Sequence, residues 1–327
     1  MVQGRGHASS PVDAENYPRN HPGTIFGAEE ADELRELHDA LAGLLDGLSI
    51  GLSSLFLAPP LRFDFFGLSP WARFKHDRAR TDELIYRKIA LRRAEILRGE
   101  SRSDVLSMLI QARDEDGQPL TDTELRDELM TLLVAGHETT ATTLCWAFDL
   151  VLAKPRVLER LLSELDTVTV EDGAPSPAEL AKLPYLDAVM KETLRMRPVI
   201  PAVGRVLKAP MDLGGQRVPA GTLVVPSTYL VHHREDIYPE PHAFRPERFL
   251  EKKVDPYTFF PFGGGVRRCL GMAFAMYEMK IVLGTILSRL SLAKVQAEPT
   301  AVRVRTFTLA PDRGVLVRVL GDRRPTP

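Results

Sequence analysis

The chain has 327 residues, of which 44% are hydrophobic and 26% are charged, and its formal net charge is −2. This length can bury a large core, and the composition is that of an ordinary globular protein. The charge shows no basic excess that would favour a nucleic acid as partner. The only cysteines are Cys145 and Cys269, too few for a disulfide framework, which agrees with a reducing cytoplasm.

The first hundred residues predict two helices and a connector. Residues 1–24 are polar and without hydrophobic periodicity, which predicts a poorly ordered segment. From about Ala28, leucines recur at helical spacing, and a second helix is predicted from Ser69 to about Arg98. The apolar connector Gly47–Gly67 could be a ligand-access lid or a loop packed on the core, and the sequence favours neither.

No segment predicts an anchorage to a membrane. The longest uncharged run, Gly47–Leu61, is too short to span a bilayer and is interrupted by glycines and prolines. A charged stretch followed by an apolar one, as in a signal peptide, does not open the sequence. We therefore expect a cytoplasmic protein without a membrane anchor.

The longest predicted helix begins at Thr121, which with Glu124 forms the pattern of a capping box, and it can run to Lys154, a length of about 50 Å. Its apolar centre holds Gly136, which costs about 1 kcal/mol relative to alanine in a helix. Glu138 and two threonines follow directly. Two local departures at one place indicate a functional site, whereas a capping threonine beside a solvated glutamate is the simpler interpretation.

A further helix is predicted over Leu183–Arg195. Within it, Glu192 and Arg195 lie three residues apart and therefore face the same way. This E-x-x-R spacing is weakly specific on its own, because Glu95 and Arg98 match it as well. The segment Phe244–Phe249, which contains Arg248, follows the second match at a distance that the first match lacks.

The remaining elements complete a mainly α fold with small β-sheets. A helix is predicted after Cys269 to about Leu290. Short strands, the first two around a Gly214-Gly215 turn, are predicted at Val203–Val206, Asp212–Val218, Thr222–Ser227, Val302–Thr308 and Val315–Leu320.

The most specific pattern is the segment 261–271, which reads P-F-G-G-G-V-R-R-C-L-G directly before a predicted helix. The first amides of that helix would favour the thiolate of Cys269, the form that binds metals. The glycines let the backbone lie close to a flat ligand, and Arg267 suits carboxylates. A thiolate beneath a planar dianion describes haem iron with an axial cysteine.

Two other interpretations of this cysteine exist. One is a redox-inert cysteine in a glycine-rich loop, but the five fixed positions of F-x-x-G-x-R-x-C-x-G arise by chance in about one of ten thousand chains of this length. The other is a zinc site, for which the sequence offers no second Cys or His within ten residues of Cys269.

The loop resembles the cysteine-ligand loop of the cytochrome P450 family, the haem-thiolate monooxygenases. The resemblance extends over residues 25–327, with the haem-binding region at 261–271, and is greatest to soluble bacterial members. It implies the P450 fold and haem b as cofactor. Members of the family have roughly another third of their length upstream, so the resemblance describes an N-terminally truncated domain, and residues 1–24 match no part of it.

The resemblance assigns roles to individual residues. Cys269 would be the iron ligand, and Glu138 and Thr139 would be catalytic, Thr139 by holding dioxygen and Glu138 by supplying protons. Glu192, Arg195 and Arg248 would form a structural network behind the cysteine loop. Contacts to the haem would come from Ala135, Arg205, Phe262, Gly263, Arg267 and Gly271. His233-Arg234 resembles an H-R step of family members, and a surface loop explains it nearly as well.

Two functions are open at this point. The resemblance implies a monooxygenase that inserts one oxygen atom of O2 into a lipophilic organic substrate, with electrons from NAD(P)H delivered by a ferredoxin or flavoprotein. The alternative is a truncated, non-catalytic remnant that binds haem weakly or not at all. The family's tryptophan–arginine helix for a propionate is not found, although Trp71–Lys75 imitates its spacing.

Overall fold

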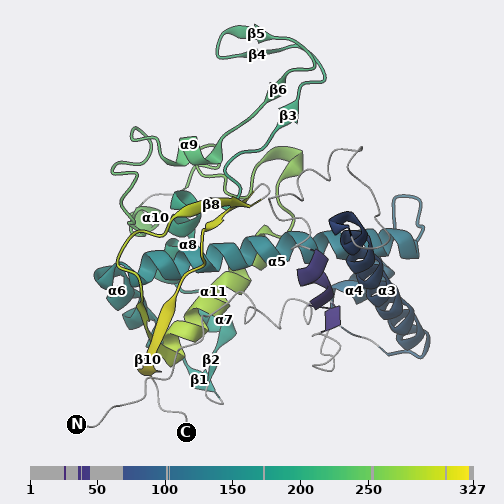
Figure 1. Cartoon of the computed structure of the whole chain (residues 1–327), viewed down its shortest axis with the longest axis horizontal. Coiled ribbons are helices and arrows are strands. Elements are labelled where there is room, and N and C mark those ends of the chain that lie inside the picture. Colours follow the sequence, from purple (N-terminus) through teal and green to yellow (C-terminus); the bar gives the residue numbers. More distant parts are fainter. Residues whose placement is uncertain are drawn as a thin grey trace. The chain divides into compact units, whose positions relative to one another are not determined.

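A computed structural model gives the structure of the chain (Figure 1). It describes residues 69–100, 102, 104–171, 174–251, 254–305 and 308–323, together with 26, 36–37 and 39–44. The chain forms two compact units, one made of Ala14–Thr139 and one that contains Thr140–Pro327, and each is described by itself. The predictions for residues 1–24 and for the connector Gly47–Gly67 lie outside the described residues.

The first unit is helical. It contains α3 (Pro70–Leu97), α4 (Val105–Gln111) and the first part of α5 (Asp122–Leu152). The Ser69 hydroxyl accepts a hydrogen bond from Ala72 N at 3.0 Å, so the predicted start of the second helix is confirmed. Its apolar core includes Phe26, Leu37, Leu41, Leu84, Ile85, Ile89, Leu106, Leu125, Leu129 and Leu133.

A buried arginine ties this unit together. Arg92 binds the Asp104 carboxylate, the Ser107 hydroxyl at 2.6 Å and the Phe26 carbonyl at 2.7 Å. Its Nε donates to Glu95 at 2.7 Å. Glu95 therefore pairs with Arg92 instead of Arg98, and the weaker of the two E-x-x-R matches does not form the pair that its spacing permits.

Helix α5 begins with the predicted capping box. The Thr121 amide donates to Glu124 Oε2 at 2.8 Å, and the Glu124 amide donates to the Thr121 hydroxyl at 3.3 Å. These bonds lower the pKa of the Glu124 carboxyl. The helix ends at Leu152, two residues before the predicted end, and Pro155 then occupies the first turn of α6 (Pro155–Leu165).

Thr121→Ala removes the hydroxyl that accepts the Glu124 amide, and we expect the free energy of unfolding to fall by about 1 kcal/mol. Thr131→Ala is the matched control, because that exposed hydroxyl donates only to the Asp127 carbonyl of the same helix. Its expected change is within about 0.5 kcal/mol. Urea denaturation followed by circular dichroism measures both, and equal effects would contradict the role of the capping box.

The second unit contains the other helices and most of the strands. Its core helix is α8 (Pro184–Met196), most of whose side chains are buried. Around it the unit contains α7 (Pro177–Leu180), α9 (Thr228–His232), α10 (Arg248–Glu251) and α11 (Met272–Arg289). None of the helices in the described part of the chain has both the length and the apolar character needed to cross a bilayer.

The strands pair into small antiparallel sheets, and the predicted mainly α fold with small sheets is confirmed. A Gly214-Gly215 turn, with φ of 57° and 81°, joins one of the hairpins as predicted. The pairs are β1 (Val170–Glu171) with β2 (Ala174–Pro175), β3 (Arg205–Val206) with β6 (Leu223–Val224), β4 (Met211–Leu213) with β5 (Gln216–Val218), β7 (Leu290–Lys294) with β10 (Val317–Asp322), and β8 (Val302–Arg305) with β9 (Thr308–Pro311).

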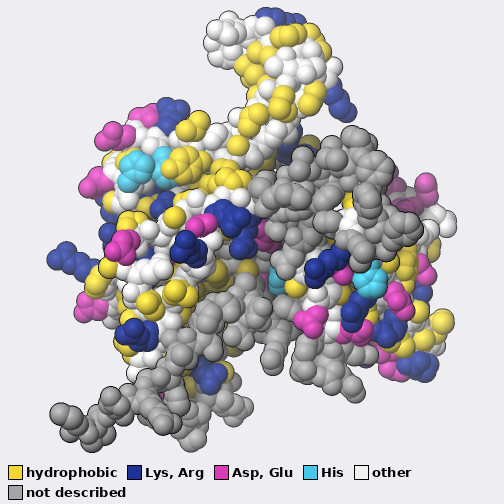
Figure 2. Space-filling view, viewed as in Figure 1, with side chains coloured by type: hydrophobic (Ala, Val, Ile, Leu, Met, Phe, Trp, Pro, Cys, Tyr) yellow, Lys and Arg dark blue, Asp and Glu magenta, His cyan; other side chains and the backbone are white. Residues whose placement is uncertain are grey.

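Strands β3 to β6 form an arm that projects from the second unit (Figure 1). Hydrophobic side chains lie on its surface (Figure 2). The exposed ones are Val206, Met211, Leu213, Leu223 and Val225.

Trp146 fixes the second half of α5 to the sheets of the second unit. It is fully buried, and its Nε1 donates to the Leu309 carbonyl of β9 at 2.9 Å. The Leu309 amide in turn donates to the Val199 carbonyl at 2.7 Å. The indole therefore links α5 to the segment that follows α8.

Candidate functional site

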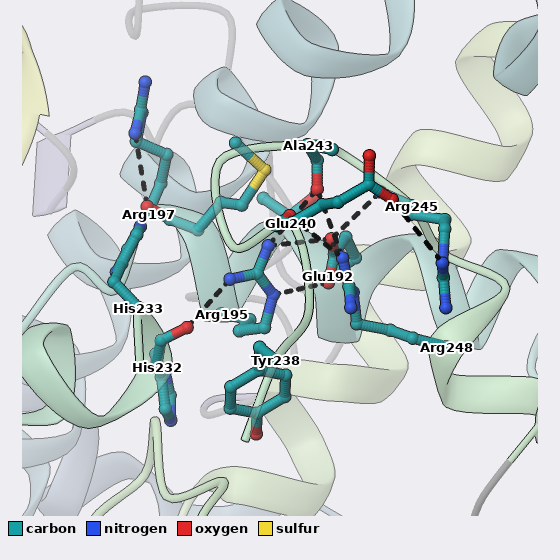
Figure 3. A network of polar contacts seen from close by, with 12 residues as sticks. Glu192, Arg195, Arg197, His232, His233, Tyr238, Glu240, Ala243, Arg245 and Arg248 are labelled. Atoms are coloured by element: carbon teal, nitrogen blue, oxygen red, sulfur yellow. Dashed lines mark hydrogen bonds and ion pairs between the residues drawn. The ribbon is translucent and has the colours of Figure 1, made fainter. Parts of the chain in front are cut away.

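Three charged side chains, distant in sequence, meet in a buried cluster of the second unit (Figure 3). Glu192 and Arg195 lie on α8, and Arg248 begins α10. Glu192 Oε2 accepts from Arg195 Nε at 2.7 Å, and Oε1 accepts from Arg195 Nη2 at 2.9 Å and from Arg248 Nε at 3.1 Å. The structure thus brings together the three residues that the sequence assigned to one network.

The other polar atoms of the cluster bond the main chain. Arg195 Nη1 donates to the His232 carbonyl at 2.8 Å, and the Arg245 amide donates to Glu192 Oε1 at 2.9 Å. Arg248 Nη1 donates to the Pro239 carbonyl at 3.2 Å. One acidic and two basic side chains therefore fix the backbone of residues 232–248, with charges that are paired and hydrogen-bonded.

The cysteine loop follows this backbone in the sequence. The Cys269 amide donates to the Phe262 carbonyl at 3.0 Å, which closes the loop. Gly263 has a φ of 71° and Gly265 a φ of 64°, conformations that side-chain-bearing residues rarely adopt. Cys269 itself is exposed, so its thiol is accessible to a ligand.

Helix α11 starts directly after the cysteine, as predicted. Gly271 is its N-cap, and a Cβ built at Gly271 would lie 3.9 Å from Cys269 Sγ. The sulfur therefore lies beside the first turn, where the helix dipole favours a thiolate. Val266 and Leu270, both fully exposed, place apolar surface in the same loop. An accessible thiol, a helix N-terminus and exposed apolar side chains suit a flat, largely apolar ligand with a metal centre, so the residues fit a haem.

Two arginines were assigned to the haem carboxylates. Arg267 lies in the loop, at the end of the 3-10 turn Gly265–Arg267, and is exposed. Arg205 lies on β3 at the base of the arm, is exposed, and its Nη1 donates to the Gly204 carbonyl at 2.8 Å. The structure thus places one of the two in the cysteine loop and the other on a separate element.

Ala135, Glu138 and Thr139 lie on the part of α5 that belongs to the first unit. The Thr139 hydroxyl donates to the Ala135 carbonyl at 2.7 Å. This bond holds the hydroxyl against the helix, and its lone pairs can accept a further hydrogen bond.

His232 was not among the predicted site residues, which instead included the adjacent His233-Arg234. His232 is fully buried, whereas His233 is half-buried and Arg234 is exposed and paired with Asp236. The sequence signal was weak, because two adjacent histidines on a short helix do not show which one faces inward. The H-R step lies, as one interpretation had it, largely at the surface.

Metal-binding side chains do not gather elsewhere in the described part of the chain. Among those residues there is no group of three or more His, Cys, Asp or Glu that could hold a metal ion.

Comparison with known proteins gives the family. Residues 23–317 match the cytochrome P450 family. The chain is 40% identical over 301 residues to cytochrome P450 135B1 of Mycobacterium tuberculosis, which covers 92% of this chain and 61% of that protein. It is 40% identical over 294 residues to cytochrome P450 137 of the same organism, with coverages of 90% and 58%. Cytochrome P450 138 of Mycobacterium bovis is 35% identical over 293 residues, with coverages of 89% and 62%.

The chain thus spans about three fifths of the length of the curated relatives that it matches. The family match covers most of the chain, and it includes the cysteine loop and the Glu192 network. The chain belongs to the cytochrome P450 family.

Proposed function

We propose that this chain is a haem-thiolate monooxygenase that inserts one oxygen atom of O2 into a lipophilic organic substrate. The observation that carries the proposal is the cysteine loop: an exposed thiol beside the N-terminus of α11, in a loop whose glycines have positive φ. Cysteine-ligated haem in this family promotes O–O cleavage.

The residues of the loop would hold the haem in complementary ways. Cys269 would supply the axial thiolate, stabilised by the first amides of α11. Phe262 would cover the ring, while Gly263 and Gly271 would let the backbone approach it without a Cβ. Arg267 and Arg205 would bind the propionates through their guanidinium groups.

Other roles belong to residues of the long helix and to partners. Ala135 would border the haem, and Glu138 and Thr139 would deliver protons to the oxygen-binding side, Thr139 through the lone pairs that its bond to Ala135 leaves available. Electrons would come from NAD(P)H through a ferredoxin or a flavoprotein. The surface around the loop would receive that donor.

The reduced carbon monoxide difference spectrum of the purified full chain tests this function. We expect about one haem per chain and a red-shifted carbonyl band, the signature of a thiolate ligand. Bound haem with an unshifted band would contradict thiolate ligation. A folded chain that takes up no haem would instead favour the non-catalytic alternative.

A further inference from the structure

The buried imidazole of His232 lies against the segment that leads into the cysteine loop. Its ring stacks on Phe259, with centroids 5.2 Å apart and 19° between the planes, and meets Phe260 edge-on at 5.6 Å. The Phe260 amide donates to His232 Nε2 at 3.1 Å. A main-chain amide can only donate, so Nε2 must carry a lone pair and the ring must be neutral, with its proton on Nδ1.

The main chain of the same residue is held by the charged cluster. The His232 carbonyl accepts from Arg195 Nη1 at 2.8 Å, and Arg195 is bound on its other side by Glu192 (Figure 3). His232 therefore touches the Glu192 network with its backbone and the loop segment with its side chain.

Two further hydrogen bonds lead from Phe260 to the cysteine. The Phe260 carbonyl accepts from the Gly263 amide at 2.9 Å, and the Phe262 carbonyl accepts from the Cys269 amide at 3.0 Å. A path of side-chain and main-chain contacts thus runs from Glu192 through Arg195 and His232 to the backbone of Cys269.

We propose that His232 is a positioning residue, which transmits the rigidity of the Glu192 network to the cysteine loop through the hydrogen bond that its neutral ring accepts from the Phe260 amide. The proposal rests on the proposed function only in taking Cys269 as the haem ligand. Positioning of the loop itself can be measured without haem.

The charges around His232 oppose its protonation. Burial, and then the positive charge of Arg195 on α8, lower its pKa to about 3, and His233 on its own helix acts in the same direction. Tyr238, 6.2 Å from the ring and edge-on to it, is the other titratable neighbour, and burial raises the pKa of its hydroxyl. The contacts from the loop segment are the apolar rings of Phe259 and Phe260. The acceptor at Nε2 is therefore kept throughout the physiological pH range.

His233 provides a matched control on the same helix. Its Nδ1 bonds the Tyr229 carbonyl at 2.8 Å, and its ring stacks on Tyr229 at 4.1 Å and lies 5.4 Å from that of His242. These contacts lead away from residues 259–260, so a change at His233 should not move the cysteine loop.

The test compares His232→Phe, which keeps a stacking ring but has no acceptor, with His232→Gln, whose amide oxygen can replace Nε2. In the full chain, hydrogen exchange of the Phe260 amide is measured by mass spectrometry of the peptides that contain it. We expect about five- to 100-fold faster exchange in His232→Phe, the factor that an unpaired buried donor implies. The rate should be near that of the unmodified chain in His232→Gln and in His233→Gln.

The same variants are then loaded with haem. In His232→Phe we expect the ratio of red-shifted to unshifted carbonyl band to fall several-fold, and we expect His232→Gln to restore it. Should His232→Phe not fold, His232→Asn takes its place, because its shorter amide cannot reach the Phe260 amide.

Unchanged exchange and unchanged band ratio in the variant without an acceptor would overturn the proposal, as would equal effects of His232→Phe and His232→Gln. If the unmodified chain binds no haem, the proposed function fails, while the exchange measurements still decide whether His232 positions the loop.

Discussion

Cys269→Ser is expected to abolish the red-shifted carbonyl band of the reduced protein while leaving the chain folded. A serine hydroxyl does not ionise near neutral pH, so it cannot replace the thiolate as iron ligand. The loop should keep its shape, because its closing hydrogen bond joins the amide of residue 269 to the Phe262 carbonyl and does not involve the sulfur. The difference spectrum, haem content and circular dichroism of the purified variant together measure this outcome.

Cys145→Ser is the matched control. Cys145 lies on α5, is half-buried, and burial raises the pKa of its thiol, which disfavours the thiolate. We expect this variant to keep the carbonyl band. Loss of the band in Cys145→Ser with retention in Cys269→Ser would show that the ligand has been assigned to the wrong cysteine.

Glu192→Gln is expected to lower the free energy of unfolding by about 3–5 kcal/mol, the typical cost of removing one partner from a buried ion pair. Both arginines that it binds are buried, and Arg195 is fully so. The amide would leave two guanidinium groups with one neutral acceptor between them. Urea denaturation measures the change, provided that the slope with urea is the same in both proteins.

An exposed ion pair of the same unit provides the comparison. Asp212 and Arg217 pair at 3.0 Å on the arm with two thirds of each side chain exposed. Asp212→Asn should change the free energy of unfolding by less than about 1 kcal/mol, because solvent screens the pair. The role of the buried network would be refuted by a Glu192→Gln effect no larger than that of Asp212→Asn.

The pH dependence of stability gives a further measure of the inferred role of His232. Its pKa in the folded chain, about 3, is below the ordinary value of 6.5, so between these values the unfolded chain binds a proton that the folded chain does not. Stability therefore falls as the pH decreases from about 6.5 towards 3. His232→Gln should remove about one proton from this dependence, whereas a chain with an accessible His232 would show no such difference.

Local chemistry allowed much of the structure to be predicted from the sequence. The capping box at Thr121, the serine cap at Ser69 and the Gly214-Gly215 turn depend on residues a few positions apart, and the structure confirms each. The cysteine loop is likewise a local pattern. Its glycines, its cysteine and the start of the following helix are contiguous, so the sequence alone identified the loop and its chemistry.

The meaning of the two E-x-x-R matches required the tertiary structure. Both have the same spacing on a helix, but Glu95 pairs with Arg92, whereas Glu192 pairs with Arg195 and with Arg248, which is 56 residues away. Which arginine an acid binds depends on the segments packed around it. Helical spacing specifies only which side chains share a face.

The same holds for the two adjacent histidines. The sequence by itself determined the family, the mainly α fold and the cysteine loop, because each follows from short-range patterns. Only the tertiary structure decided that His232, and not His233, connects the Glu192 network to that loop. The choice depends on which of two neighbouring side chains on α9 turns towards Phe259 and Phe260, and packing between segments distant in sequence sets that orientation.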